Sequence, residues 1–156
     1  ATVTQMIMNS YEATLAVMPQ LAGFIPMLTG TGGNCGSQSS TLVIRGLAIG
    51  EIEFRDLFKV IWKEVRIAVC ISIILAVVNG TRILIMGQGD AMMAFTIGVT
   101  MACTVIIAKV VGCTLPLVAK KVGLDPAIMA TPLISTLVDI STISVYFAIV
   151  SFVFRL

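Results

Sequence analysis

The apolar stretch between Asp125 and Arg155 contains a single charged residue, Asp139. A stretch of this length can cross a bilayer as a helix, since a spanning helix needs about 20 mostly apolar residues. A carboxylate at the middle of a span costs about 2.5–3.5 kcal/mol to insert, so such a residue faces a bundle interior or a water-filled path. Asp139 is therefore a candidate functional site, and the natural ligand of its carboxylate is a cation.

The rest of the chain has the same apolar character. Of its 156 residues, 58% are hydrophobic and 12% are charged, and the mean hydropathy is +1.05, whereas a soluble domain carries about 25% charged residues. The composition predicts an all-α, polytopic bundle of transmembrane helices. The chain has no histidine, which excludes imidazole proton relays and histidine metal sites, and it offers no nucleophile–base pair, so an enzyme is not expected. Its four cysteines form no Cys-x-x-Cys motif, and we interpret them as small apolar helix residues.

Prolines, glycines and loops divide the chain into spans. Residues 1–9 are expected to end a first helix that begins outside this sequence, as in a piece of a longer polypeptide. Residues 15–49 would be about 50 Å long as a straight helix, too long for a bilayer core of about 30 Å. Their glycine cluster indicates either a break or a close-packed stretch at membrane depth, and we expect the second span to be broken. Three further spans are predicted at about 67–86, 91–118 and 126–154.

Residues 51–66 have a different pattern, in which apolar residues recur at helical spacing and most charged residues lie off that stripe. This pattern predicts an interfacial amphipathic helix lying on the membrane surface. The apolar stripe consists of Phe54, Leu57, Phe58, Ile61, Trp62 and Val65.

Basic residues are distributed unevenly among the predicted loops. The loop at 45–66 holds five Lys or Arg and the loop at 120–125 holds two, whereas Arg82 and Arg155 stand alone on the other side. The positive-inside rule places the first two loops in the cytoplasm and the C-terminus outside, in a multi-pass protein of the cell inner (plasma) membrane. Lys109, inside the fourth span, is expected to snorkel toward the cytoplasmic surface, with a salt bridge to Asp139 as the alternative.

Oxygen-bearing side chains surround Asp139 if the last span is a helix. The same face carries Ser135, Thr136, Thr142 and Tyr146. Carboxylate and hydroxyl oxygens suit hard divalent cations. Mg²⁺ sheds water reluctantly, so one aspartate in a hydroxyl-lined path fits hydrated Mg²⁺ better than a dehydrated Ca²⁺ cage; Mn²⁺ and Ca²⁺ stay as alternative ions. The competing interpretation is an aspartate bonded to hydroxyls for packing alone.

The second span supplies further polar groups. Asn34 and Gln38 lie one turn apart, so they share a face and present amide oxygens. The nearby glycines allow close backbone approach and can free carbonyls from helical bonding. The Gly32–Gly36 spacing also matches a helix-packing motif, which is compatible with pore lining. The glycines of this cluster are Gly30, Gly32, Gly33 and Gly36.

Two segments carry a specific resemblance. The first is Pro26-Met-Leu-Thr-Gly-Thr-Gly-Gly-Asn34-Cys-Gly36-Ser-Gln38-Ser; the second is Asp125-Pro126 followed by Pro132-Leu-Ile-Ser-Thr-Leu-Val-Asp139. Together they resemble the membrane domain of the MgtE family of magnesium channels, and the similarity runs through nearly the whole chain. The resemblance implies a homodimer with five spans per subunit, the first truncated here, and a pore on the two-fold axis lined by the second and fifth spans. It also implies cytoplasmic regulatory domains that this sequence lacks.

The resemblance assigns roles in metal binding to Asp139, Asn34, the carbonyl of Gly30 and, as a further candidate, the carbonyl of Ser135. Gly33, Gln38, Thr136 and Thr142 are expected to line the same path.

The expected function is a Mg²⁺-selective channel that conducts the hydrated ion. The first alternative is a Na⁺- or H⁺-coupled secondary transporter, for which a broken helix at the midplane is equally typical. The second is a non-transporting membrane scaffold, for which Asp139→Ala would leave function intact. Expected partners are a second copy of the chain, the lipid bilayer, a metal ion and the missing regulatory domains; nucleic acid is not expected.

Overall fold

The computed structural model describes residues 2–155, and the side chains of residues 3–127 and 132–155. Over these residues the chain contains helices and no strand, which confirms the all-α prediction. The long helices are α3 (Ile25–Ala48), α4 (Leu57–Ile85), α5 (Ala91–Lys121) and α6 (Pro126–Phe154). The short ones are α1 (Thr2–Ser10), α2 (Glu12–Val17) and the 3₁₀ turns η1 (Pro19–Phe24) and η2 (Phe54–Asp56).

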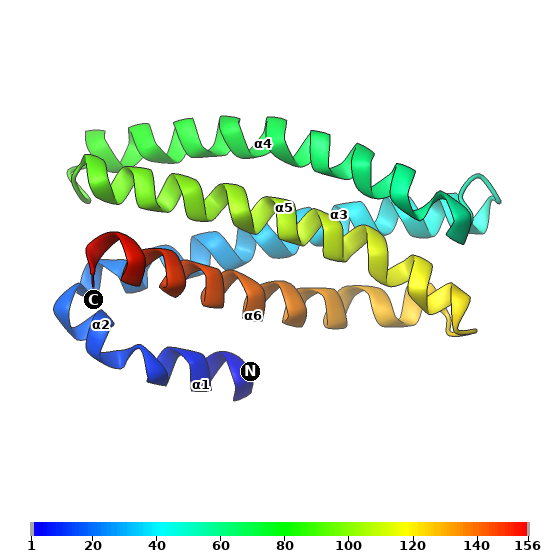
Figure 1. Cartoon of the computed structure of the whole chain (residues 1–156), viewed down its shortest axis with the longest axis horizontal. Helices are drawn as coiled ribbons and strands as arrows, with labels where there is room; N and C mark the ends of the chain where they lie inside the picture. The colour runs from blue at the N-terminus through cyan, green and yellow to red at the C-terminus, as the bar shows by residue number, and fades with distance from the viewer. Residues whose placement is uncertain (1, 156) are drawn as a thin grey trace.

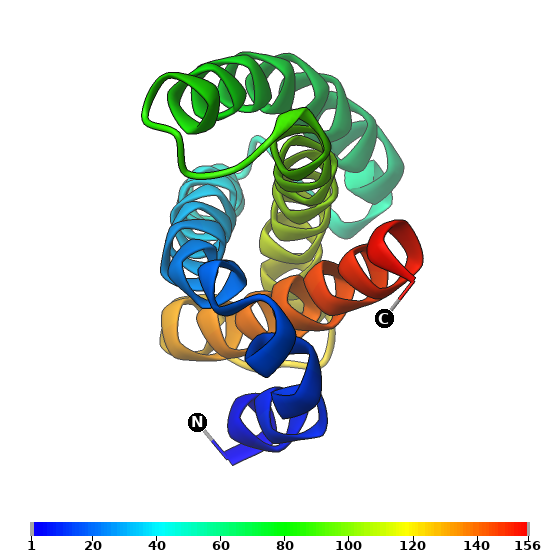
Figure 2. The same ribbon diagram turned by 90° about the vertical axis from the view of Figure 1, so that its left-hand side faces the viewer.

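The long helices run alternately back and forth and lie side by side (Figure 1). Helix α5 occupies the centre, in contact with α3, α4 and α6, and α3 also packs against α6. Seen from the end, α4 lies on the outside of α5, while α1 folds back beneath α6 (Figure 2). The order of the helices therefore puts α3 and α6, far apart in the sequence, next to each other.

The central position of α5 explains why it has buried residues from its first turn, at Met93, to its last, at Ala119. Its buried apolar residues recur every three or four positions, as in Met93, Ile97, Met101 and Val105, which is the spacing of one helical face. The helix begins at Asp90, whose carboxylate accepts a hydrogen bond of 2.8 Å from the backbone N–H of Met93. This N-cap satisfies a backbone donor that the first turn would otherwise leave free.

Three helical stretches among the described residues are long and apolar enough to cross a membrane: Phe54–Ile85, Ala91–Lys121 and Pro132–Phe154. They correspond to the predicted third, fourth and fifth spans. The outer helix α4 exposes large apolar side chains such as Ile73, Val77 and Ile85, which suit a lipid environment. Helix α3 has 24 residues and is about 36 Å long at 1.5 Å per residue. It is long enough to cross a membrane, but its glycines and polar side chains make it less apolar than these three stretches.

The second segment is interrupted, but not where the glycines predicted. The interruption lies at η1, where Pro19 opens a 3₁₀ turn, and α3 begins only at Ile25. The glycine cluster lies inside a continuous α3, so the prediction of a break at Gly30–Gly36 is wrong, and the alternative of a close-packed stretch holds at Gly32 and Gly36. Proline removes a backbone donor and fixes φ, whereas glycines inside a helix can be retained when neighbouring helices pack closely on them.

The separate interfacial helix predicted at 51–66 is also wrong. After η2, residues Leu57 onward continue without a break into α4 as far as Ile85. The predicted apolar stripe is divided: Phe54, Leu57 and Ile61 pack against a buried cluster of α3 and α5 residues, while Phe58 and Trp62 are exposed. A helix of 29 residues that packs on one side only shows the same periodicity as a helix lying on a membrane surface.

Candidate functional site

Helix α6 carries Asp139 about twenty ångströms from its start, at 1.5 Å per residue. The start is fixed by Asp125, whose carboxylate accepts a 2.8 Å hydrogen bond from the N–H of Ala127, and by Pro126 in the first turn. Asp139 itself is half-buried. None of the ion pairs among residues 2–155 includes it, so the predicted alternative of a Lys109–Asp139 salt bridge is wrong.

The hydroxyl groups near Asp139 divide into two sets. Ser135 is half-buried and Thr136 is exposed. Thr136 donates its hydroxyl to the carbonyl of Pro132 at 2.9 Å, so its oxygen keeps lone pairs available to water. These positions and Asp139 are accessible from outside a single copy of the chain.

Thr142 and Tyr146 belong to the packed side of α6 instead. Thr142 is 1% exposed, and its hydroxyl oxygen would lie 3.2 Å from a Cβ added at Gly32. Tyr146 is fully buried and donates its hydroxyl to the carbonyl of Leu21 at 2.9 Å. The predicted polar face of α6 is therefore shorter than expected, and Thr142 does not share the accessible face in one copy of the chain.

Helix α3, like α6, has an accessible side and a packed side, and its glycines lie on both. Gly30, Asn34 and Gln38 are exposed and follow one another at intervals of one turn. Gly33 is half-buried, and a Cβ added at Gly30 or Gly33 would meet nothing within 4 Å. This accessible face of α3 presents amide oxygens and uncovered backbone, although the Gly30 carbonyl lies within a regular helix and not at a helix break.

The other two glycines form the packing side of α3. A Cβ added at Gly32 would lie 2.8 Å from side-chain carbons of Thr104 and Val138, and one at Gly36 would lie 3.0 Å from Ile134. Gly32 and Gly36 therefore let α5 and α6 approach α3 closely. Val138, which contacts Gly32, is the residue before Asp139. The accessible faces of α3 and α6 therefore belong to two helices that pack against each other.

Among the described residues, no group of three or more His, Cys, Asp or Glu side chains could enclose a metal ion. On the accessible faces of α3 and α6, one copy of the chain offers a single carboxylate, Asp139, together with amide, hydroxyl and carbonyl oxygens. Such a donor set suits a hard cation that keeps most of its water.

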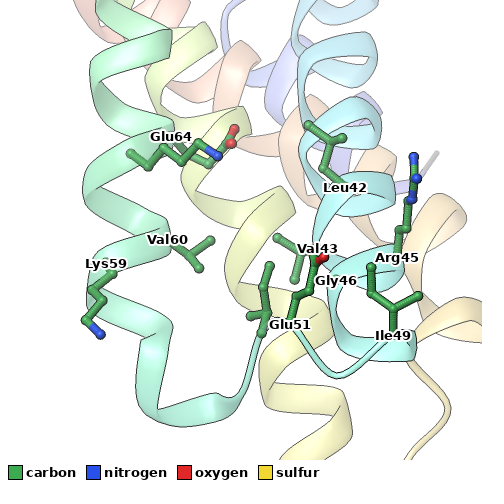
Figure 3. Close-up of a pocket in the computed structure, with 11 residues that line it drawn as sticks. Leu42, Val43, Arg45, Gly46, Ile49, Glu51, Lys59, Val60 and Glu64 are labelled. Carbon is green, nitrogen blue, oxygen red and sulfur yellow. The ribbon is translucent and has the colours of Figure 1, made fainter.

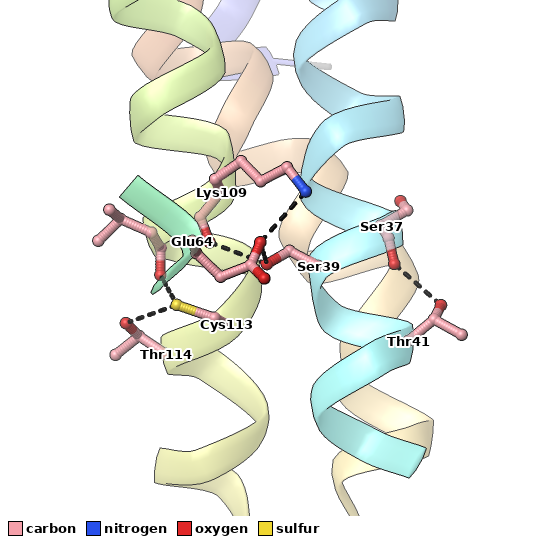
Figure 4. Close-up of polar contacts among 8 residues, drawn as sticks. Ser37, Ser39, Thr41, Glu64, Lys109, Cys113 and Thr114 are labelled. Atoms are coloured by element: carbon pink, nitrogen blue, oxygen red, sulfur yellow. Dashed lines mark hydrogen bonds and ion pairs between the residues drawn. The ribbon is translucent and has the colours of Figure 1, made fainter. Parts of the chain in front are cut away.

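A second polar cluster was missed by the sequence analysis. Lys109 is 3% exposed and forms an ion pair with Glu64, with 3.1 Å between Nζ and Oε2. The same oxygen of Glu64 accepts a 2.7 Å hydrogen bond from Ser39 (Figure 4). The predicted snorkelling of Lys109 is therefore wrong. Two opposite charges in neighbouring spans were the available signal, but the interfacial helix assigned to 51–66 concealed it.

A pocket lies elsewhere, between α3, α4 and their connection (Figure 3). It has a volume of about 440 Å³ and is lined by apolar residues such as Val43 and Val60, with Arg45, Lys59 and Glu51 among its polar residues. None of the predicted metal-site residues lines it.

Comparison with known proteins places the chain in a family. The family model described as MgtE, divalent cation transporter, matches residues 25–149. Three proteins named magnesium transporter MgtE are similar to the chain. The one from Thermus thermophilus is 33% identical over 147 residues, covering 94% of this chain and 32% of the relative.

The protein from Bacillus subtilis is 35% identical over 147 residues, covering 92% of this chain and 32% of the relative. The one from Enterococcus faecalis is 32% identical over 155 residues, covering 97% of this chain and 33% of the relative. The chain thus spans about a third of the length of these relatives. With the family model covering residues 25–149, the chain belongs to the MgtE family of divalent cation transporters.

Proposed function

We propose that this chain is the ion-conducting membrane part of a magnesium channel, in which two copies enclose a water-filled pore with Asp139 at the selectivity site. The observation that carries the proposal is the accessible polar face of two neighbouring helices. On α3 it consists of Gly30, Asn34 and Gln38, and on α6 of Ser135, Thr136 and Asp139.

This face is incompatible with lipid. Asp139 lies within Pro132–Phe154, a stretch apolar enough to cross a membrane, and a carboxylate facing hydrocarbon costs several kcal/mol. The exposed amides of α3 add to that cost, because hydrocarbon offers them no hydrogen-bond partner. A water-filled path between protein surfaces removes both penalties and supplies a route for an ion.

The donor set favours a divalent ion that keeps its water. Two copies facing each other across a two-fold axis would bring two Asp139 carboxylates toward one site. Like-charged carboxylates disfavour each other's ionised form, and a divalent cation between them relieves that repulsion more than a monovalent one. Amide and carbonyl oxygens of Asn34 and Gly30 would accept hydrogen bonds from the water around the ion. Mg²⁺ is the favoured ion because it gives up water reluctantly, and the similar proteins are named magnesium transporters.

The distribution of basic residues supports an orientation. Arg45, Arg55, Lys59, Lys120 and Lys121 lie at the end of the bundle where α3 and α5 finish and α4 begins (Figure 1). The positive-inside rule makes this end cytoplasmic and the C-terminus external, in the plasma membrane. Inward flow would then be driven by the membrane potential, at about 2.3 kcal/mol per charge per 100 mV and twice that for a divalent ion.

The course of α3 favours a channel over the coupled transporter. The transporter alternative drew on a helix broken at the midplane, yet α3 is continuous from Ile25 to Ala48 through the glycine cluster. A continuous pore-facing helix fits passive conduction without an unwound binding site.

The test is ion flux into proteoliposomes that contain the full-length protein, for the wild type and for Asp139→Asn. We expect Mg²⁺ flux that requires neither a Na⁺ nor a pH gradient. We expect Asp139→Asn to lower it at least about tenfold, because a unit charge about 5 Å from a divalent ion contributes several kcal/mol even at an effective dielectric constant of about 20.

Asp125→Asn is the matched control. It removes one negative charge from the same helix about 20 Å away, and asparagine still caps a helix, so Mg²⁺ flux should stay near wild type. Flux that needs a Na⁺ or pH gradient would favour the coupled transporter. Equal flux in Asp139→Asn and wild type would refute the assignment of the selectivity site.

A further inference from the structure

Three buried polar side chains from three different helices meet inside the bundle. Ser39 comes from α3, Glu64 from α4 and Lys109 from α5 (Figure 4). The ion pair measures 3.1 Å, and Ser39 lies 2.7 Å from the carboxylate of Glu64 and 3.2 Å from the carbonyl of Lys109. The Lys109 and Glu64 side chains are 4% and 6% exposed. These contacts join the three helices at one level.

This cluster has no place in the proposed ion path. It lies on the packed side of α3, whereas Asn34 and Gln38 lie on the accessible side. Buried charges are costly to remove from water, and replacing such pairs with apolar residues is often neutral or stabilising. Their best-attested use is to select one packing arrangement among several similar ones.

The ion pair lies beside the middle of α3, where this helix has few large buried side chains. Between Leu28 and Val43, the buried residues of α3 are all small: Gly32, Cys35, Gly36, Ser39 and Ser40. Small residues let helices approach closely, but they provide few side chains that interlock. The hydrogen bond from Ser39 is directional, and its acceptor is held by the ion pair between α4 and α5.

We propose that the Glu64–Lys109 pair acts through Ser39 to set the rotation of α3, and thereby positions Asn34 and Gln38 in the pore; the proposal rests on the proposed function. Ser39, Glu64 and Lys109 are positioning residues that do not contact the ion. Ser39 follows Gln38 in sequence and lies about 140° around the helix from Asn34. Its hydroxyl therefore binds on the side of α3 that faces away from the pore.

A small rotation of α3 would displace its side chains far enough to affect selectivity. A helix with its side chains has a radius of about 5–6 Å, so a rotation of about 20° moves a side-chain tip by about 2 Å. A shift of that size separates an amide oxygen from a water molecule bound to the ion, since such hydrogen bonds require donor–acceptor distances of about 2.7–3.2 Å.

The chain contains its own matched control. Ser40 is the next residue on α3 and is 2% exposed, like Ser39 at 0%, but its buried hydroxyl has no hydrogen-bond partner among the described residues. Ser39→Ala and Ser40→Ala make the same chemical change at adjacent buried positions. Only the first disconnects α3 from the ion pair.

The experiment compares these two variants of the full-length protein in proteoliposomes. We expect Ser39→Ala to lower the ratio of Mg²⁺ flux to K⁺ flux about threefold to tenfold, the scale of one hydrogen bond, while its melting temperature matches that of Ser40→Ala. Equal flux ratios in the two variants would overturn the proposal, as would a lower ratio that follows a lower melting temperature in both.

A second readout does not depend on transport. Single cysteines placed at Asn34, Ser37, Gln38 and Thr41 in a protein without its native cysteines are labelled with a water-soluble thiol reagent. We expect Ser39→Ala to move the most reactive position around α3, and Ser40→Ala to leave the pattern unchanged. An unchanged pattern with Ser39→Ala refutes the positioning role, whether or not the protein conducts Mg²⁺. A moved pattern in a protein without Mg²⁺ flux would support the positioning role and reject the proposed function.

Discussion

Gly112 of α5 lies against the backbone of Gly36 of α3, and this contact predicts a large effect of a small substitution. A Cβ added at Gly112 would overlap the carbonyl oxygen of Gly36 and lie 2.9 and 3.0 Å from its carbonyl carbon and Cα. Carbon atoms in contact are normally about 3.5–4.0 Å apart. Since the obstacle is backbone, no side chain can rotate away, and α3 and α5 must separate by about 1 Å.

We therefore expect Gly112→Ala to destabilise the protein by about 1–3 kcal/mol, the usual cost of overpacking a tight core. For a chain of this size that corresponds to a melting temperature lower by roughly 2–12 °C. The loss would be measured by thermal unfolding in detergent, monitored by size-exclusion fluorescence.

Gly80→Ala on α4 is the control. A Cβ at Gly80 meets nothing within 4 Å, and alanine favours the helix by up to about 1 kcal/mol over glycine, so this variant should melt at or above the wild-type temperature. A Gly112→Ala protein that melts at the wild-type temperature would show that α3 and α5 are not in backbone contact there.

Three further effects on stability are expected, each measured by the same thermal unfolding. Lys109→Met leaves the carboxylate of Glu64 buried without its partner and should cost about 3–5 kcal/mol, most of which the double variant with Glu64→Gln should restore. Tyr146→Phe removes the hydrogen bond to the carbonyl of Leu21 and should cost about 0.5–1.5 kcal/mol; no change would mean that water replaces the hydroxyl. Asp90→Ala removes the N-cap of α5 and should cost about 1 kcal/mol, whereas Asp90→Asn should cost almost nothing.

Composition and hydropathy were sufficient to predict an all-helical bundle. The low charge content and the apolar stretches around 67–86, 91–118 and 126–154 predicted helices that coincide with most of α4, α5 and α6. These features could be read from the sequence because the requirement to satisfy backbone groups in lipid acts on each span separately. The same local argument singled out Asp139 as a charge in an apolar span, and it needed no knowledge of the neighbouring helices.

The errors arose where one pattern fits two structures. An amphipathic stretch at 51–66 fits a helix on the membrane surface as well as a helix that packs on one side, and α4 proved to be the latter. Four clustered glycines fit a helix break as well as a close-packed helix, and in α3 they are close-packed or exposed within a continuous helix. Periodicity reports that a helix has two sides, but it does not report what covers each side.

The sequence by itself therefore determined that this is an all-helical chain of a membrane transporter family, with one carboxylate in its last span and a glycine-rich second one. Only the tertiary structure decided that Lys109 pairs with Glu64, that Thr142 and Tyr146 are buried, and that Asn34 lies on an accessible face. The physical reason is that burial in lipid depends on local composition, whereas pairing depends on the rotation of each helix. That rotation is set by contacts between residues far apart in the sequence, such as those from α3 to α5.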